Sequence, residues 1–198
     1  MSPNSKKMTF DSYDAKLPTN NIFYKLPVAS LTLGMVSFLI AVLFMKGREE
    51  EFYLSFHVSW LFFLSIALGG MFFVLIQFLT KAGWSVLLRR FGENIAGTMP
   101  LLFILMVLMF AGSHTLFHHW VHPEANDTLL QSKQWYLNLP FFYGRSLLYF
   151  SIWLFTCYYL RKKSLEQDIT GSHENTYQLQ TMSIPLVILS GLAVTFAS

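Results

Sequence analysis

Long apolar stretches dominate this sequence. Four of them cover residues 26–45, 53–80, 99–119 and 139–160, and a fifth begins near residue 179 and is still apolar at residue 198. A helix needs about 20 apolar residues to cross the hydrocarbon core of a bilayer, and each stretch is close to that length or longer. The sequence therefore predicts an all-α integral membrane protein with about five transmembrane helices.

The composition argues against a soluble enzyme. Of the 198 residues, 54% are hydrophobic and 13% are charged, whereas soluble domains are about 25% charged because their surface stays in water. The net charge of +3 does not indicate nucleic-acid binding, because Lys and Arg lie between the apolar stretches, where they suit lipid headgroups. The single cysteine, Cys157, excludes an internal disulfide and any metal or iron–sulfur site built from cysteines.

The distribution of positive charge predicts the orientation of the chain. Ten of the 14 Lys and Arg residues lie before the first stretch or in the second and fourth connections, and three lie in the first and third connections. Lys and Arg are enriched on the cytoplasmic side of membrane proteins. We therefore expect the N-terminus, with a polar tail over residues 1–25, in the cytoplasm, and the first and third connections outside.

Residues 81–96 are predicted to form an interfacial helix. Apolar residues recur there at three- and four-residue steps: Trp84, Leu87, Leu88, Phe91 and Ile95. The other face is polar: Arg89, Arg90, Glu93 and Asn94. This pattern is typical of a helix in the plane of the cytoplasmic interface, with its charged face in water. The alternative is that the segment simply continues the second span into water.

The chain is also expected to bend or loop at two further places. Gly112, between Ala111 and Ser113, loosens the third span shortly before its histidines, which predicts a local kink. The polar segment 164–178 separates the fourth span from the fifth and is predicted to be a loop.

Arg145 is the clearest candidate functional residue, because ionisable side chains are costly in lipid. It lies six residues past Leu139, or about 9 Å below the outer end of its span at 1.5 Å per residue. That depth is marginal for a side chain that must reach back to water, so we expect a partner for Arg145 inside the protein.

Several histidines are expected at a similar depth. His57 lies four residues past the start of the second span, and His114, His118 and His119 occupy the last turns of the third. Alternate spans run in opposite directions, so these imidazoles and Arg145 all belong to the outer half of the membrane. His114 and His118 are four residues apart and therefore share a helix face.

Three interpretations of this group remain open. In the first, Arg145 and the histidines are structural. In the second they form a quinol site or a proton path, because quinone carbonyls need hydrogen-bond donors and an imidazole near pH 7 can accept a proton. In the third, His57 and either His114 or His118 hold a b-type haem between two spans.

An ordered set of short strings resembles one protein family. The strings are Ala82-Gly83-Trp84-Ser85-Val86 with Arg89-Arg90, Tyr136-Leu137-Asn138 with Pro140-Phe141-Phe142, Arg145, Tyr149-Phe150, Trp153, Gln167-Asp168 and Thr195-Phe196-Ala197-Ser198. They follow the family's order and spacing from about Tyr53 to Ser198. In these features the chain is similar to the second NrfD-like membrane subunit of alternative complex III, a bacterial quinol:cytochrome c oxidoreductase, and to the membrane subunits of polysulfide reductase.

The resemblance implies a helical subunit of the bacterial inner membrane that binds no haem, metal or iron–sulfur cluster itself. Its expected partners are a second NrfD-like membrane subunit, an iron–sulfur subunit, multihaem and monohaem cytochrome c subunits and small membrane subunits. Those partners would hold the haem c and the iron–sulfur clusters. Family members are longer, so the resemblance also implies that this chain is the first half of a ten-helix subunit. Arg145 matches the family's arginine after Pro-Phe-Phe.

Together, these features predict a membrane subunit that helps to form a quinone- or proton-handling cavity near the periplasmic side. The candidate residues are Arg145, His57, His114 and His118, and no catalytic residue is assigned. The alternatives are a scaffold subunit in which Arg145 is a structural clamp, and a b-haem cytochrome.

Overall fold

The structure is a computed structural model that describes residues 22–121, 128–170 and 173–197. Within these ranges all regular secondary structure is helical. Four described segments are long and apolar enough to cross a membrane: Lys25–Phe44, Glu49–Leu79, Leu87–Ala111 and His173–Ala197. The chain is therefore an all-α, multi-pass membrane protein, as predicted. The number of crossing helices and the orientation of the N-terminus stay predictions.

The chain divides into two units, residues 1–46 and 47–198. The first contains helix α1 (Ile22–Phe44), which coincides with the predicted span 26–45. The described side chains of α1 are exposed along its whole length and are apolar on every side, as is typical of a helix surrounded by lipid. The predicted polar tail lies outside the described residues up to residue 21.

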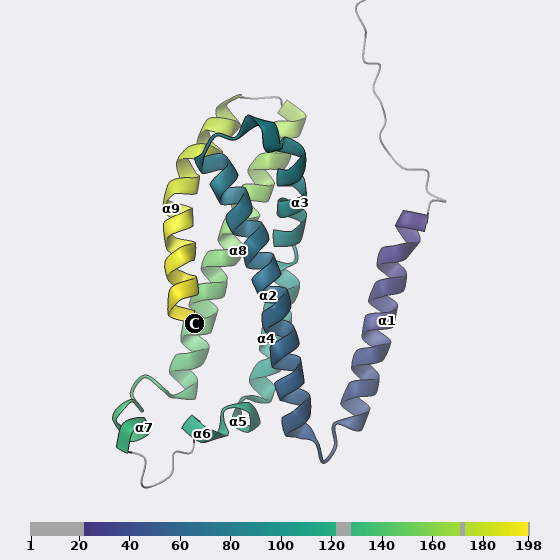
Figure 1. Ribbon diagram of the computed structural model, residues 1–198, viewed down its shortest axis with the longest axis vertical. Coiled ribbons are helices and arrows are strands. Elements are labelled where there is room, and N and C mark those ends of the chain that lie inside the picture. The colour runs from purple at the N-terminus through teal and green to yellow at the C-terminus, as the bar shows by residue number, and fades with distance from the viewer. Residues whose placement is uncertain (1–21, 122–127, 171–172, 198) are drawn as a thin grey trace, which may run out of the picture. The chain divides into compact units, whose positions relative to one another are not determined.

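The second unit is a bundle of long helices that run alternately in opposite directions (Figure 1). Its central helix, α2 (Glu49–Leu79), packs against α4 (Met99–Ala111) and α9 (His173–Ala197), and α9 packs along α8 (Leu139–Thr170). The core between them is apolar, with Met71 and Phe78 of α2, Met106 of α4 and Leu179 of α9 almost fully buried. The large apolar side chains on the outside are typical of a surface that faces lipid.

Three short helices lie at the end of the bundle where α2 and α8 begin (Figure 1). They are α5 (Ser113–Leu116), α6 (His118–Val121) and α7 (Thr128–Ser132). The third predicted span, 99–119, therefore differs from the structure, because α4 ends at Ala111. Gly112 ends it: the ring of Tyr53 occupies the space that a Cβ of Gly112 would need. The predicted kink is thus a complete break in the helix.

Helix α8 contains the fourth predicted span, 139–160, but continues through the first part of the predicted loop to Thr170. Helix α9 begins at His173, so most of the segment 164–178 is helical and the prediction of a loop is wrong. Side-chain contacts explain the extension, because Gln167 Nε2 donates to Thr176 Oγ1 at 2.6 Å and ties the two helix ends together.

The chain reverses direction between α2 and α3 (Val86–Ala96) through a tight turn and the 3-10 helix η1 (Gly83–Ser85). Lys81 has φ +54°, the left-handed conformation that ends many helices. Its N–H donates to Phe78 O at 3.2 Å, and the N–H of Ala82 donates to Gln77 O at 3.0 Å. These two bonds satisfy carbonyls at the end of α2 and direct the chain back along it.

Helix α3 lies within the predicted interfacial segment 81–96, but its charged face, expected in water, is turned toward the bundle. Leu87 and Phe91 are 75% and 63% exposed, whereas Glu93 is 5% exposed. An outward apolar face is stable in lipid and not in water. Helix α3 packs along α2, and α4 follows after two residues, so that Leu87–Ala111 is one apolar segment. Leu87–Ala111 is thus a candidate span that begins with α3, and the position of α3 in the interface plane stays a prediction.

Two glycines allow α2 and α3 to approach closely. A Cβ on Gly70 would lie 2.9 Å from Ile95 Cγ2 and 3.0 Å from the carbonyl oxygen of Gly92. A Cβ on Gly92 would in turn lie 3.0 Å from the side chains of Phe73 and Val74. Small residues at such crossings are a usual means of helix association in membranes.

We predict that Gly70→Ala destabilises the protein, because the added methyl group must push α3 away from α2. Overpacking of this kind costs about 1–3 kcal/mol. The adjacent Gly69→Ala is a matched control, because a Cβ at Gly69 meets nothing within 4 Å and Ala is the better helix former. Unfolding of both variants in mixed detergent and SDS micelles, followed by circular dichroism, measures the difference. Equal stability of the two variants would contradict the proposed crossing.

Candidate functional site

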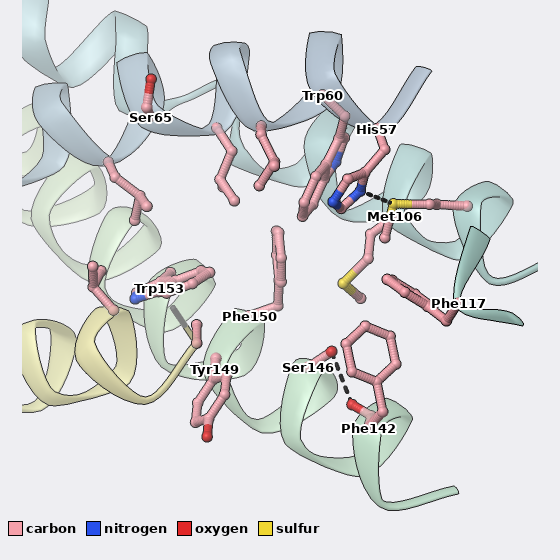
Figure 2. A pocket seen from close by; sticks show the side chains of 16 residues that line it. His57, Trp60, Ser65, Met106, Phe117, Phe142, Ser146, Tyr149, Phe150 and Trp153 are labelled. Atoms are coloured by element: carbon pink, nitrogen blue, oxygen red, sulfur yellow. Dashed lines mark hydrogen bonds between the residues drawn. The ribbon is translucent and has the colours of Figure 1, made fainter. Parts of the chain in front are cut away.

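A cavity of about 480 Å³ lies inside the second unit, between α2, α4, α8 and α9 (Figure 2). Its described lining consists of side chains from these four helices together with Phe117, and these described residues include no Lys, Arg, Asp or Glu. The volume and the apolar lining are typical of sites for small, largely apolar ligands, in which a few polar groups fix the ligand's orientation.

His57 is the ionisable side chain of this cavity. It projects from the first part of α2 and is half-buried. Its Nδ1 lies 2.8 Å from the sulfur of Met109, on the last turn of α4 (Figure 2). The imidazole stacks on Trp60, with ring centroids 6.1 Å apart, and meets the ring of Phe117 edge-on. The ring is therefore held between two aromatic side chains and a thioether.

Aromatic rings form another part of the cavity wall. Phe150 lies between Trp60 and Trp153, with centroid distances of 5.9 and 5.1 Å. The indole N–H of Trp60 donates to Leu102 O at 2.9 Å, and that of Trp153 donates to Ser190 O at 3.4 Å. Because both N–H groups are already bonded to backbone, the indoles present apolar surfaces to the cavity.

The hydroxyl groups around the cavity are also turned away from a ligand. Ser65 Oγ donates to Phe62 O at 2.7 Å, and Ser146 Oγ donates to Phe142 O at 2.9 Å. The hydroxyl of Tyr149 points outward (Figure 2). His57 is thus the lining residue best placed to form a new hydrogen bond.

Arg145 does not line the cavity. Its guanidinium lies over the ring of Tyr136, 3.9 Å from the centroid, and 5.0 Å from the centroid of Phe141. Asn138, between these two aromatic residues in the sequence, accepts the N–H of Phe141 at 2.9 Å and so caps α8. The partner predicted for Arg145 is therefore an aromatic pair, Phe141 in the first turn of α8 and Tyr136 just before this helix, and these contacts favour a structural clamp.

The other predicted histidines also lie apart from the cavity. His114 is in α5 and His118 is in α6, and both side chains are exposed. The side chain of His119 lies outside the described part of the structure. These short helices share the end of the bundle where α2 and α8 begin, but of the four candidates only His57 lines the cavity. The part of the lining that the structure describes thus supplies no second histidine for a b-type haem.

A buried ionic cluster at the other end of the bundle was missed by the sequence analysis. The carboxylate of Glu93 accepts from Arg90 Nη1 and from Ser164 Oγ, each at 2.7 Å. Arg90 also pairs with Asp168 of α8. The guanidinium of Arg89 lies 4.4 Å from the centroid of the Phe78 ring. The cluster therefore joins the polar face of α3 to α2 and α8.

A signal for this cluster is present in the sequence. Arg89, Arg90 and Glu93 are three and four residues apart, so they share a helix face. They also directly precede the apolar run from Met99, and charged residues next to a span often pair inside the protein. The cluster was missed because the polar face of α3 was expected to lie in water.

Comparison with models of known protein families finds no match, and comparison with curated proteins finds none either.

We predict that Glu93→Leu strongly destabilises the second unit, because it leaves Arg89 and Arg90 without their shared carboxylate. Removing one partner of a buried ion pair costs about 3–5 kcal/mol. Glu166→Leu is the control, since it removes the more exposed pair with Lys163, a change worth about 1 kcal/mol or less. SDS-induced unfolding of the two variants measures both effects. A Glu93 variant as stable as the control would show that the cluster does not hold α3.

Proposed function

We propose that this chain is an integral membrane subunit of a respiratory quinol:cytochrome c oxidoreductase of the alternative complex III type. In this proposal the His57 cavity binds the ring of a lipid-soluble quinone or quinol. The observation that carries the proposal is the single imidazole in an otherwise uncharged, aromatic-lined cavity within a membrane-type bundle. Such a cavity suits a neutral ligand with a polar oxygen on a flat ring.

The same proposal accounts for the family-like strings. Asn138 caps α8 and Arg145 lies on the rings of Tyr136 and Phe141, so this string orients the start of α8. Phe150 and Trp153 of the next strings line the cavity. Part of the resemblance thus rests on residues that either shape the cavity or place the helix that carries it.

The proposed setting is the bacterial inner membrane, with the N-terminus in the cytoplasm and the His57 end of the bundle near the periplasm. Proposed partners are a second NrfD-like subunit, an iron–sulfur subunit, cytochrome c subunits that carry haem c, and small membrane subunits. Bound lipid would cover the exposed apolar side chains that no partner covers.

A scaffold role is the second candidate function, and the position of Arg145 favours it. A guanidinium that lies on two aromatic rings outside the cavity acts through the structure of α8. In that role the chain would anchor its neighbours and bind no quinone.

We predict that His57→Leu weakens hydroquinone binding by a factor of about three to ten, the value of one neutral hydrogen bond. The full chain in lipid nanodiscs is titrated without oxygen with a short-tailed benzohydroquinone or naphthohydroquinone, and calorimetry measures the affinity. His114→Leu is the control, since it removes an imidazole outside the cavity. Absence of saturable binding to the unaltered chain would overturn the quinone proposal and leave the scaffold role.

We predict that Arg145→Leu lowers the yield of assembled complex but leaves quinol oxidation per assembled complex unchanged. The complex is purified from native membranes through a tag on this chain, and haem c recovered per chain measures assembly. Arg48→Leu is the control, because Arg48 is in a surface ion pair with Glu51. A fully assembled Arg145 variant without quinol oxidation would instead place Arg145 in the quinone site.

A further inference from the structure

The contact between His57 and Met109 determines which nitrogen of the imidazole carries the proton. The sulfur of Met109 can accept a hydrogen bond but has no proton to donate. At 2.8 Å, Nδ1 therefore must carry the hydrogen, because the other tautomer would bring two lone pairs together. A neutral imidazole has one N–H, so Nε2 is left as an acceptor.

The surroundings of His57 favour the neutral imidazole. Among the described residues that line the cavity there is no carboxylate that would stabilise an imidazolium, and an unpaired charge in an apolar site is costly. The positively charged form would also place a second N–H, on Nε2, among apolar side chains. The neutral ring with its hydrogen on Nδ1 is thus the form that fits both the sulfur of Met109 and the apolar side chains around Nε2.

The acceptor nitrogen is accessible to a ligand. Within the described residues, Nε2 makes no hydrogen bond to the protein. Nε2 is also not fully buried. Among the described residues, the one fully buried side-chain nitrogen or oxygen that lacks a hydrogen-bond partner is Arg89 Nε. The second ring nitrogen lies on the side of the ring away from Met109 (Figure 2). A ligand in the cavity can therefore reach it.

We infer that the His57 cavity selects ligands that donate a hydroxyl, and hence binds a hydroquinone more tightly than the corresponding quinone. This inference rests on the proposed function. His57 Nε2 accepts the hydroxyl of the reduced ring, and Met109 is a positioning residue that keeps the hydrogen of His57 on Nδ1. A quinone carbonyl would place an acceptor against an acceptor, and a site that loses a hydrogen bond in this way discriminates against the ligand.

Three ring-matched ligands test this selectivity: a short-tailed hydroquinone, its quinone and its dimethyl ether, which resembles the hydroquinone but has no hydroxyl. Calorimetric titration of the full chain in nanodiscs without oxygen gives the three affinities. We expect the hydroquinone to bind about tenfold more tightly than the other two. Equal affinities would overturn the selectivity and leave quinone binding intact, whereas no binding of any ligand would overturn both proposals.

Met109→Leu tests the positioning role, because leucine cannot accept the Nδ1 hydrogen. We expect the ratio of hydroquinone to quinone affinity to fall toward one, since either tautomer of His57 then becomes available. Met99→Leu is the control: Met99 is a buried methionine of the same helix that does not line the cavity, and the affinity ratio should keep its original value. If Met109 had only a structural effect, the substitution would lower the affinities for hydroquinone and quinone equally. An unchanged ratio of the two affinities would therefore overturn the positioning role of Met109.

Nitrogen NMR gives a test that does not depend on any ligand. The imidazole nitrogens of the full chain are labelled, and the difference between the unaltered protein and His57→Gln isolates the resonances of His57. We expect a protonated Nδ1 and an unprotonated Nε2. A hydrogen on Nε2 would overturn the inference even if quinones bind in the cavity.

Discussion

Polar side chains inside the second unit must find partners within the helix bundle, because its outer surface is apolar. This constraint explains why α3 turns its charged face inward. Glu93 meets Arg90 and Ser164, and the apolar side of α3 faces outward. The close approach at Gly70 and Gly92 makes these contacts possible, since any larger residue there would move the polar face of α3 away from α8.

The same constraint shapes the cavity at the opposite end of the bundle. The N–H groups of Trp60 and Trp153 are bonded to backbone carbonyls, and the Ser65 and Ser146 hydroxyls are bonded within their own helices. One ring nitrogen of His57, Nδ1, is paired with the sulfur of Met109. What remains is a single acceptor in an apolar space, and a single polar group of this kind orients a ligand without attracting charged ones.

The long helices were predictable because about 20 consecutive apolar residues have few other stable arrangements. The cavity was predictable only in part. His57 was found from the cost of an imidazole in an apolar stretch, but Met109 carries no sequence signal that links it to a residue 52 positions away. Arg145 was expected to find a distant partner, although Phe141 is four residues before it and on the same helix face. An amphipathic pattern shows that α3 has two faces but not which one meets the protein.

The charged side chains lie at one end of the second unit and the cavity at the other, and this arrangement limits which ligands the cavity can bind. The ion pairs of Glu93 and Arg90 lie near the α2–α3 turn, whereas the described residues that line the His57 cavity include no Lys, Arg, Asp or Glu. Three lining residues are also exposed, namely Leu61 and Ser65 of α2 and Ala197 of α9, which means that the cavity reaches the outer surface of the bundle. A charged ligand from water would gain no ion pair there and would lose its hydration. A neutral, lipid-soluble ring would lose little on entry and would gain the one hydrogen bond that His57 offers.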